Sequence, residues 1–285
     1  MRTTLLTAAL LAAACSGEAR RDAPTNRGTV VLGQVDLSFY AVTGEVTQQI
    51  LREQGYEVEV VTGDHATIYP QLGRGEVHLL AASWLPFGHA DLYAEVEDSA
   101  ERLTPLYEGA RFYWVVPAYV PEDQVATLAD LAEPDVARRM PDTIAALPEG
   151  TGTTISSQDV MDAYGLSGAY ALEPGGPEAW SSSLRIALDE EAWTVVPLWT
   201  PHWWNAAYDL RELEDPRGVL PEPDTAWLVA HESLRDVVDA ETLERLRDLR
   251  ISRAEVTEMD RLVNAEGLTP REAARGWADG TLAAE

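Results

Sequence analysis

The chain contains no lysine: all 21 of its basic residues are arginine, against 48 aspartates and glutamates in 285 residues. Without lysine, neither a Schiff base nor a lysine general base is available, which removes several classes of enzyme chemistry. The net charge of -27 also argues against nucleic acid as a partner, because a phosphate backbone is bound by a basic surface.

Cysteine is nearly absent as well, since Cys15 is the only one. An internal disulfide is therefore excluded, and stability must come from the hydrophobic core. The five histidines show no spacing typical of a zinc site, no Gly-x-Ser-x-Gly motif occurs, and the turn at residues 150–152 lacks the third glycine of a dinucleotide fingerprint. We expect no metal, no cofactor and no enzymatic activity.

Long apolar runs are missing apart from residues 3–14, which follow Arg2 and carry no charge. This run is too short to span a bilayer as a stable helix and is typical of a bacterial secretion signal. Ala12-Ala13-Ala14-Cys15 resembles a lipobox, so residues 1–15 are expected to be a lipoprotein signal peptide with Cys15 as the lipidated residue. The alternative is an ordinary signal peptide, which would leave Cys15 as a free thiol.

The rest of the chain alternates strand and helix signals. Residues 16–28 are polar and are predicted to be a flexible tether. Between residues 29 and 83 the β-rich runs alternate with helical patterns, which predicts a parallel sheet covered by helices in this part of the chain. The expected strands are residues 29–37, 57–62, 78–83, 112–116, 143–147 and 193–199, and the expected helices include one near 128–140 and one ending near Gly165.

We predict an α/β fold with two lobes and a ligand cleft between them. Lobe 1 is expected to comprise residues 29–114 and 212–285, and lobe 2 residues 115–211. In the C-terminal part, Ser252 with Glu255 and Thr269 with Glu272 fit capping boxes at the starts of two helices.

Two of the nine tryptophans stand apart by position. Trp84 follows a predicted strand and Trp199 ends another, each shortly before a proline. In parallel α/β sheets, ligands gather outside the carboxyl ends of the strands. Exposed ring faces there suit a quaternary ammonium group, which has no N–H to donate and is held by ring quadrupoles. The alternative for each ring is ordinary core packing.

Around these two tryptophans the chain resembles the glycine betaine-type substrate-binding proteins of ABC importers, over about residues 29–220. The resemblance is carried by Trp84-Leu85-Pro86 with His89, by Leu198-Trp199-Thr200-Pro201-His202-Trp203, by Tyr208-Asp209-Leu210, and by Leu213-x-Asp215-Pro216. It implies a type II periplasmic-binding fold that closes on its solute by hinge motion.

The resemblance also implies roles for individual residues. Trp84 and Trp199 match two walls of an aromatic box around a trimethylammonium group, and His89 matches a histidine that contacts the ligand carboxylate. The backbone amides near Ala146 and Leu147, before the glycine-containing turn, match the other carboxylate contacts. A surface position is the alternative for His89.

One wall of the box departs from the family pattern, because Leu37 stands where many members carry a third tryptophan. Phe39 or Tyr40, a few residues on, could supply the missing ring. The expected ligand is therefore glycine betaine or a related betaine.

The expected partners are an ABC permease and its ATPase, together with a membrane through the lipid anchor. Two alternatives stay open: a solute sensor for choline, carnitine or a sulfonium analogue, and an extracytoplasmic hydrolase that uses aspartate or glutamate.

Overall fold

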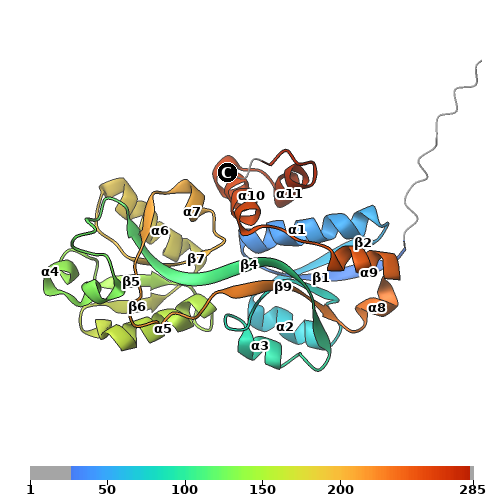
Figure 1. The fold of residues 1–285 in the computed structure, drawn as a ribbon, viewed down its shortest axis with the longest axis horizontal. Coiled ribbons are helices and arrows are strands. Elements are labelled where there is room, and N and C mark those ends of the chain that lie inside the picture. Colours follow the sequence, from blue (N-terminus) through green and yellow to red (C-terminus); the bar gives the residue numbers. More distant parts are fainter. Residues whose placement is uncertain (1–26, 283–285) are drawn as a thin grey trace, which may run out of the picture.

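The computed structural model describes residues 27–282, so the predicted signal peptide, Cys15 and nearly all of the tether lie outside the described residues. The described chain forms two α/β lobes that lie side by side, with strand β4 passing from one to the other (Figure 1). The strands of the main sheet are β1 (Thr29–Val35), β2 (Glu57–Gly63), β3 (Leu79–Leu85), β4 (Ala100–Pro117), β7 (Val196–Thr200), β8 (Leu210–Glu212) and β9 (Asp224–His231).

The main sheet is mixed, with the order β2-β1-β3-β9-β4-β7 and with β8 paired to β4. The predicted parallel arrangement is right for β1, β2 and β3. The later strands run antiparallel, β9 to both β3 and β4, and β7 to β4. The chain leaves the first lobe along β4 and returns along β9, so these two neighbours run in opposite directions.

Strand β4 is much longer than the sequence pattern predicts. The pattern indicates a strand only at residues 112–116, whereas β4 has 18 residues and begins at Ala100. Its first half pairs with β9 through three irregularities in register. Since such bulges break the regular alternation of side chains, the first half of β4 gives no clear strand signal in the sequence.

Two layers of helices cover the first lobe. One face of its sheet carries α1 (Ser38–Glu53), packed against the C-terminal helices α10 (Arg253–Glu266) and α11 (Pro270–Ala278). The other face carries α2 (His65–Gly73) and α3 (Ala90–Ala94), whose apolar side chains share a cluster with β3 and β9 (Figure 1). The short α8 (Leu234–Val237) and α9 (Ala240–Arg247) follow β9.

The second lobe has its own core, built around Trp114 and Val116 of β4. It contains the parallel pair β5 (Thr143–Ala146) and β6 (Ala171–Pro174) with α5 (Gly152–Tyr164), α6 (Pro177–Glu190) and α7 (Trp204–Ala207). The predicted lobe boundaries at residues 114/115 and 211/212 fall within β4 and β8.

The single helix predicted near residues 128–140 is wrong. The chain there forms a 3-10 turn, Leu128–Ala132, and the short helix α4 (Pro134–Ala137). The break lies at Glu133, whose backbone is extended (ψ 130°), because the residue before a proline disfavours the helical conformation. Another 3-10 turn, Leu166–Gly168, follows α5.

The C-terminal capping boxes are confirmed. Ser252 accepts the Glu255 N–H at 3.1 Å and Thr269 accepts the Glu272 N–H at 3.2 Å. In each box the glutamate carboxylate accepts the N-cap N–H in return. The first capping box thus fixes the start of α10 after Ser252. Helix α10 lies against α1, close to the junction of the lobes.

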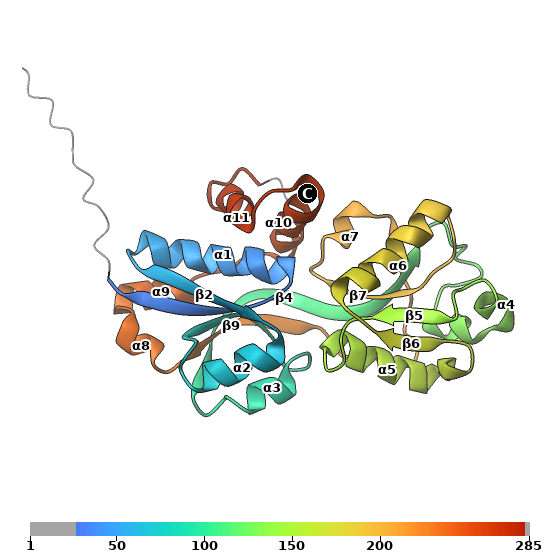
Figure 2. The ribbon, with the colours of Figure 1, turned by 180° about the vertical axis from the view of Figure 1, so that it is seen from behind.

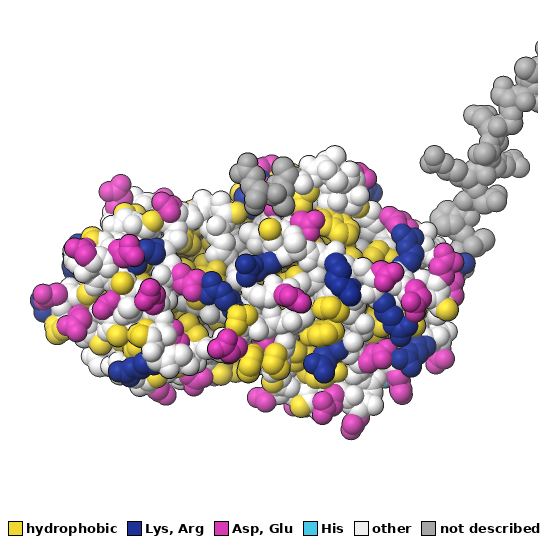
Figure 3. All heavy atoms as spheres, viewed as in Figure 1, with side chains coloured by type: hydrophobic (Ala, Val, Ile, Leu, Met, Phe, Trp, Pro, Cys, Tyr) yellow, Lys and Arg dark blue, Asp and Glu magenta, His cyan; other side chains and the backbone are white. Residues whose placement is uncertain are grey.

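The surface carries acidic side chains over the whole face drawn in Figure 3, with arginines interspersed among them. Within residues 27–282, no helix is long and apolar enough to cross a membrane. The same residues contain no cluster of three or more His, Cys, Asp or Glu side chains arranged to hold a metal ion.

Candidate functional site

A cavity lined by aromatic side chains lies where the two lobes meet. Its walls come from the start of α1, the ends of β3 and β7, strand β4, and the first turn of α5, which approach one another near the middle of the molecule (Figure 2). The residues that line it are Leu37, Phe39, Tyr40, His65, Trp84, His89, Phe112, Leu147, Thr151, Gly152, Thr153 and Trp199. Six of the seven predicted ligand contacts therefore share one cavity.

Phe39 lies between the two predicted box tryptophans. Its ring centroid is 5.8 Å from that of Trp84 and 6.0 Å from that of Trp199. The ring of Tyr40 packs against Phe39 at 4.1 Å, and its hydroxyl lies 3.3 Å from Nε2 of His65. Phe39 thus contacts both tryptophans, whereas Tyr40 lies on the histidine side of the cavity.

Trp199 is supported from behind by other aromatic rings. Trp180 of α6 stacks on it at 5.0 Å, and Trp204 stacks on Trp180 at 4.1 Å. His202 packs edge-on against Trp199, with the ring centroids 4.6 Å apart and the ring planes at 72°. His202 also braces the turn after Trp199, because its Nδ1 accepts the Trp204 N–H at 3.1 Å.

The indole N–H of Trp199 is buried and has no hydrogen-bond partner among the described residues. Leaving such a donor unpaired costs about 1–3 kcal/mol, so this group is unusual in a folded protein. The N–H of Trp84, in contrast, donates to the Tyr107 hydroxyl at 3.1 Å.

His89 is fixed by the backbone of Trp84. The Trp84 N–H donates to Nδ1 of His89 at 2.9 Å, and the His89 N–H donates to the Trp84 carbonyl at 2.9 Å. Because Nδ1 accepts a hydrogen bond, the proton of the neutral ring must be on Nε2. His89 is only 5% exposed, so it is not a surface histidine, and its Nε2–H remains as a hydrogen-bond donor.

His65 is a lining residue that the sequence interpretation missed. It is the first residue of α2, two residues after the end of β2, and its ring lies 4.3 Å from that of His89. The rule that placed Trp84 and Trp199 at strand ends applies equally to the end of β2. His65 could therefore have been found by applying that rule to every strand.

The ionisable groups of the cavity are neutral near pH 7. Burial lowers the pKa of His65 to about 4 and lowers the pKa of His89 well below its usual value, with the neighbouring His65 adding to the second effect. Burial also raises the pKa of Tyr40 well above its usual value. The cavity thus offers rings and hydrogen-bond donors but no formal charge.

The second lobe contributes backbone groups. Leu147 lines the cavity, and so do the first residues of α5, a helix start whose first N–H groups have no partner within the helix. A side-chain carbon at Gly152 would lie 2.8 Å from the Phe112 ring, so only glycine allows this close approach. Ala146 is not among the lining residues; it is buried in β5, and its carbonyl accepts the Gly175 N–H at 2.9 Å.

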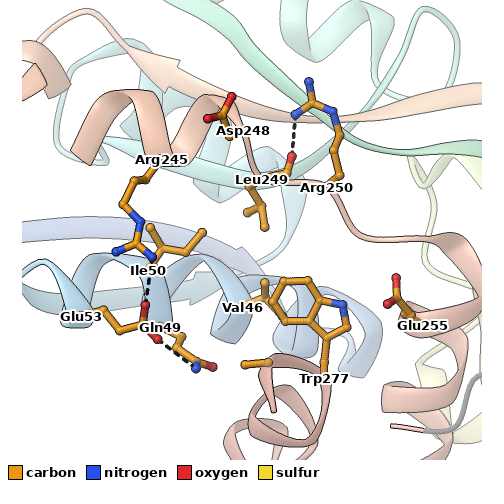
Figure 4. Close-up of a pocket in the computed structure, with 11 residues that line it drawn as sticks. Val46, Gln49, Ile50, Glu53, Arg245, Asp248, Leu249, Arg250, Glu255 and Trp277 are labelled. Carbon is orange, nitrogen blue, oxygen red and sulfur yellow. Dashed lines mark hydrogen bonds and ion pairs between the residues drawn. The ribbon is translucent and has the colours of Figure 1, made fainter. Parts of the chain in front are cut away.

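The aromatic cavity is small, about 30 Å³, which is room for about two water molecules. A groove of about 390 Å³ adjoins it and shares His89, Phe112 and Gly152 with it. A larger hollow of about 570 Å³ lies between α1, α9 and the C-terminal helices, but its arginines are already paired, with Arg245 on Glu53 and Arg250 on the Leu249 carbonyl (Figure 4). Only the small cavity combines stacked rings with free donors, within the part of the chain described.

The fold and this cavity define a two-lobed binding protein with its site at the junction of the lobes. The sequence model of one family, "Substrate binding domain of ABC-type glycine betaine transport system", matches residues 28–280. The chain belongs to this family of substrate-binding proteins of transporters, which confirms the resemblance drawn from the tryptophan motifs.

Solved structures of similar fold agree. A glycine betaine/L-proline-binding protein (ProX) from Borrelia burgdorferi has a TM-score of 0.78 and 22% identity, covering 88% of this chain and 93% of that one. Lactococcal OpuAC, in its closed form with glycine betaine, also has a TM-score of 0.78, with 24% identity over 89% of this chain and 96% of that one. These likenesses confirm the predicted type II periplasmic-binding fold.

Among curated proteins, the glycine betaine/carnitine transport binding protein GbuC of Listeria monocytogenes is 26% identical over 147 residues. The match takes in 51% of this chain and 48% of that protein, so the chain spans about half the length of this curated relative.

The depressed pKa of His65 makes a testable contribution to stability. Between pH 6.5 and about pH 4 the unfolded chain binds a proton at this residue that the folded chain does not, so the free energy of unfolding falls as the pH falls. We expect a smaller fall in His65→Gln than in the wild type, measured by urea unfolding at pH 7, 5.5 and 4.5. Equal pH dependence in both proteins would contradict the assignment.

Proposed function

We propose that the protein captures glycine betaine or a closely related betaine in the aromatic cavity and delivers it to an ABC permease, without chemical change. The observation that carries the proposal is the cavity itself: the rings of Phe39, Trp84 and Trp199 surround a space with no formal charge, and the Nε2–H of His89 borders it. A quaternary ammonium group is attracted to ring faces and needs no acceptor.

The two ends of a betaine would find different partners. Its trimethylammonium group would contact the ring faces, each contributing about 2 kcal/mol when desolvated. Its carboxylate would accept hydrogen bonds from His89, from the unpaired N–H of Trp199 and from backbone amides at the start of α5, where the helix dipole also favours an anion. Leu147 remains a proposed backbone contact, and Ala146 is proposed to act only by holding that segment.

Binding requires the cavity to open. A betaine needs several times the room of two water molecules, whereas the cavity holds about 30 Å³. Because Trp84 and His89 come from one lobe and Trp199 and the α5 residues from the other, separation of the lobes would admit the ligand and closure would bury it. Such hinge closure is the usual way in which two-lobed binding proteins respond to ligand.

Membership of the family supports an extracytoplasmic location. We propose that the apolar residues 3–14 direct export and that Cys15, once lipidated, anchors the protein at a membrane near its permease and ATPase. A single acyl chain binds a membrane only weakly, whereas two or more hold it stably.

The aromatic box is tested by calorimetry with glycine betaine. Trp84→Ala and Trp199→Ala should each weaken binding by about tenfold or more, since each removes a desolvated ring worth about 2 kcal/mol. Trp193→Ala is the matched control, because Trp193 lies outside the cavity and packs against Arg139. Unchanged affinity in both cavity variants would disprove the box.

The third wall is tested by comparing Phe39→Leu with Tyr40→Phe. We expect Phe39→Leu to weaken betaine binding several-fold, because an aliphatic side chain of similar size has no ring quadrupole. Tyr40→Phe keeps the ring and removes only the hydroxyl near His65, so its affinity should stay close to that of the wild type. Unchanged affinity in Phe39→Leu would show that Phe39 does not form the third wall.

The anchor is tested in cells that express the full chain. Wild-type protein should sediment with membranes and carry lipid on Cys15, as detected by mass spectrometry of the N-terminal peptide. Cys15→Ala should be recovered free of the membrane. A wild-type protein with an unmodified Cys15 would favour an ordinary signal peptide instead.

A further inference from the structure

Asp224 is a buried carboxylate that accepts two hydrogen bonds from the loop carrying His89. It is the first residue of β9, where the chain re-enters the first lobe, and it is 2% exposed. Its Oδ1 accepts the Phe87 N–H at 2.7 Å and its Oδ2 accepts the Gly88 N–H at 2.8 Å. A side chain 136 residues away along the sequence thus holds two consecutive amides of the loop between β3 and α3.

The fit around this contact is close. A side-chain carbon at Gly88 would lie 3.0 Å from Oδ2 of Asp224 and 3.3 Å from Cβ of Trp84. Hydrogen bonds to an ionised acceptor are shorter and about twice as strong as neutral ones. Although burial raises the pKa of Asp224, the bonds from Phe87 and Gly88 oppose that effect. The loop is held by two hydrogen bonds to one carboxylate.

The positions of Trp84 and His89 depend to different degrees on the hydrogen bonds between Asp224 and the loop. Trp84 lies within β3, opposite Ala226 in the β3–β9 ladder, and its indole is bonded to Tyr107. His89 lies beyond the ladder, directly after the two amides that Asp224 holds. Loss of the Asp224 contact would leave the ring of Trp84 in place and remove two of the four hydrogen bonds that hold the His89 loop, so that only the two bonds between His89 and the Trp84 backbone would direct the Nε2–H of His89.

We propose that Asp224 is a positioning residue that fixes the His89 loop, and thereby sets the preference of the site for cations that also carry a carboxylate. The inference rests on the proposed betaine function and goes further, because it assigns ligand discrimination to a residue that does not line the cavity. In Asp224→Asn, the amide group would face one of the two backbone donors, so one of the bonds is replaced by a donor–donor contact.

The test is calorimetry with two ligands, glycine betaine and tetramethylammonium, which share the cationic group and differ in the carboxylate. Asp224→Asn should weaken glycine betaine binding by about tenfold and leave tetramethylammonium binding within about twofold of the wild type. Asp224→Ser, which keeps a rotatable hydroxyl and no fixed donor, serves as the second variant if the first does not fold.

Asp260→Asn is the matched control. Asp260 is equally buried and also accepts a backbone N–H, that of Trp203 at 2.8 Å, but it lies on α10 outside the cavity. Its variant should leave the ratio of the two affinities unchanged.

A selective loss of glycine betaine affinity supports the inference. Equal loss of both ligands would show a merely structural role and overturn it, as would wild-type affinity for both. If the variant kept wild-type affinity for both ligands and the wild type bound glycine betaine, the proposed function would stand and only the inference would fall. A wild type that bound neither ligand would overturn both.

Discussion

The antiparallel pair β4 and β9 is the constraint on which both lobes and the cavity depend. The register of β4 with β7 places Phe112 opposite Trp199, and the register of β9 with β3 places Ala226 opposite Trp84. Three adjoining ladders, β3–β9, β9–β4 and β4–β7, therefore position an aromatic wall in each lobe. Since a shift of one residue would turn every side chain to the other face, the register decides whether the rings meet.

Much of this could be predicted from sequence, because the informative signals are local. Trp84 and Trp199 are each the second-last residue of a strand, and the capping boxes at Ser252 and Thr269 are complete within four residues. The choice between Phe39 and Tyr40 could not be made, since neighbouring residues in a helix differ only in direction, which depends on what packs around them.

The features that sequence reasoning missed are long-range. Asp224 accepts hydrogen bonds from the His89 loop, and Trp180 packs behind Trp199. Both contacts join segments that only the folded chain brings together. The first half of β4 was missed for another reason, because its bulges break the alternating pattern. Leu147 lines the cavity, whereas Ala146 does not.

The packing behind Trp199 has a thermodynamic consequence. Trp180 and Trp204 stack in series behind its ring, and His202 packs against its edge, so the ring is held on one face and at one edge. Its conformational entropy is lost when the protein folds and not when the ligand binds. This wall of the cavity is therefore pre-organised, and more of its interaction energy with a ligand can appear as affinity.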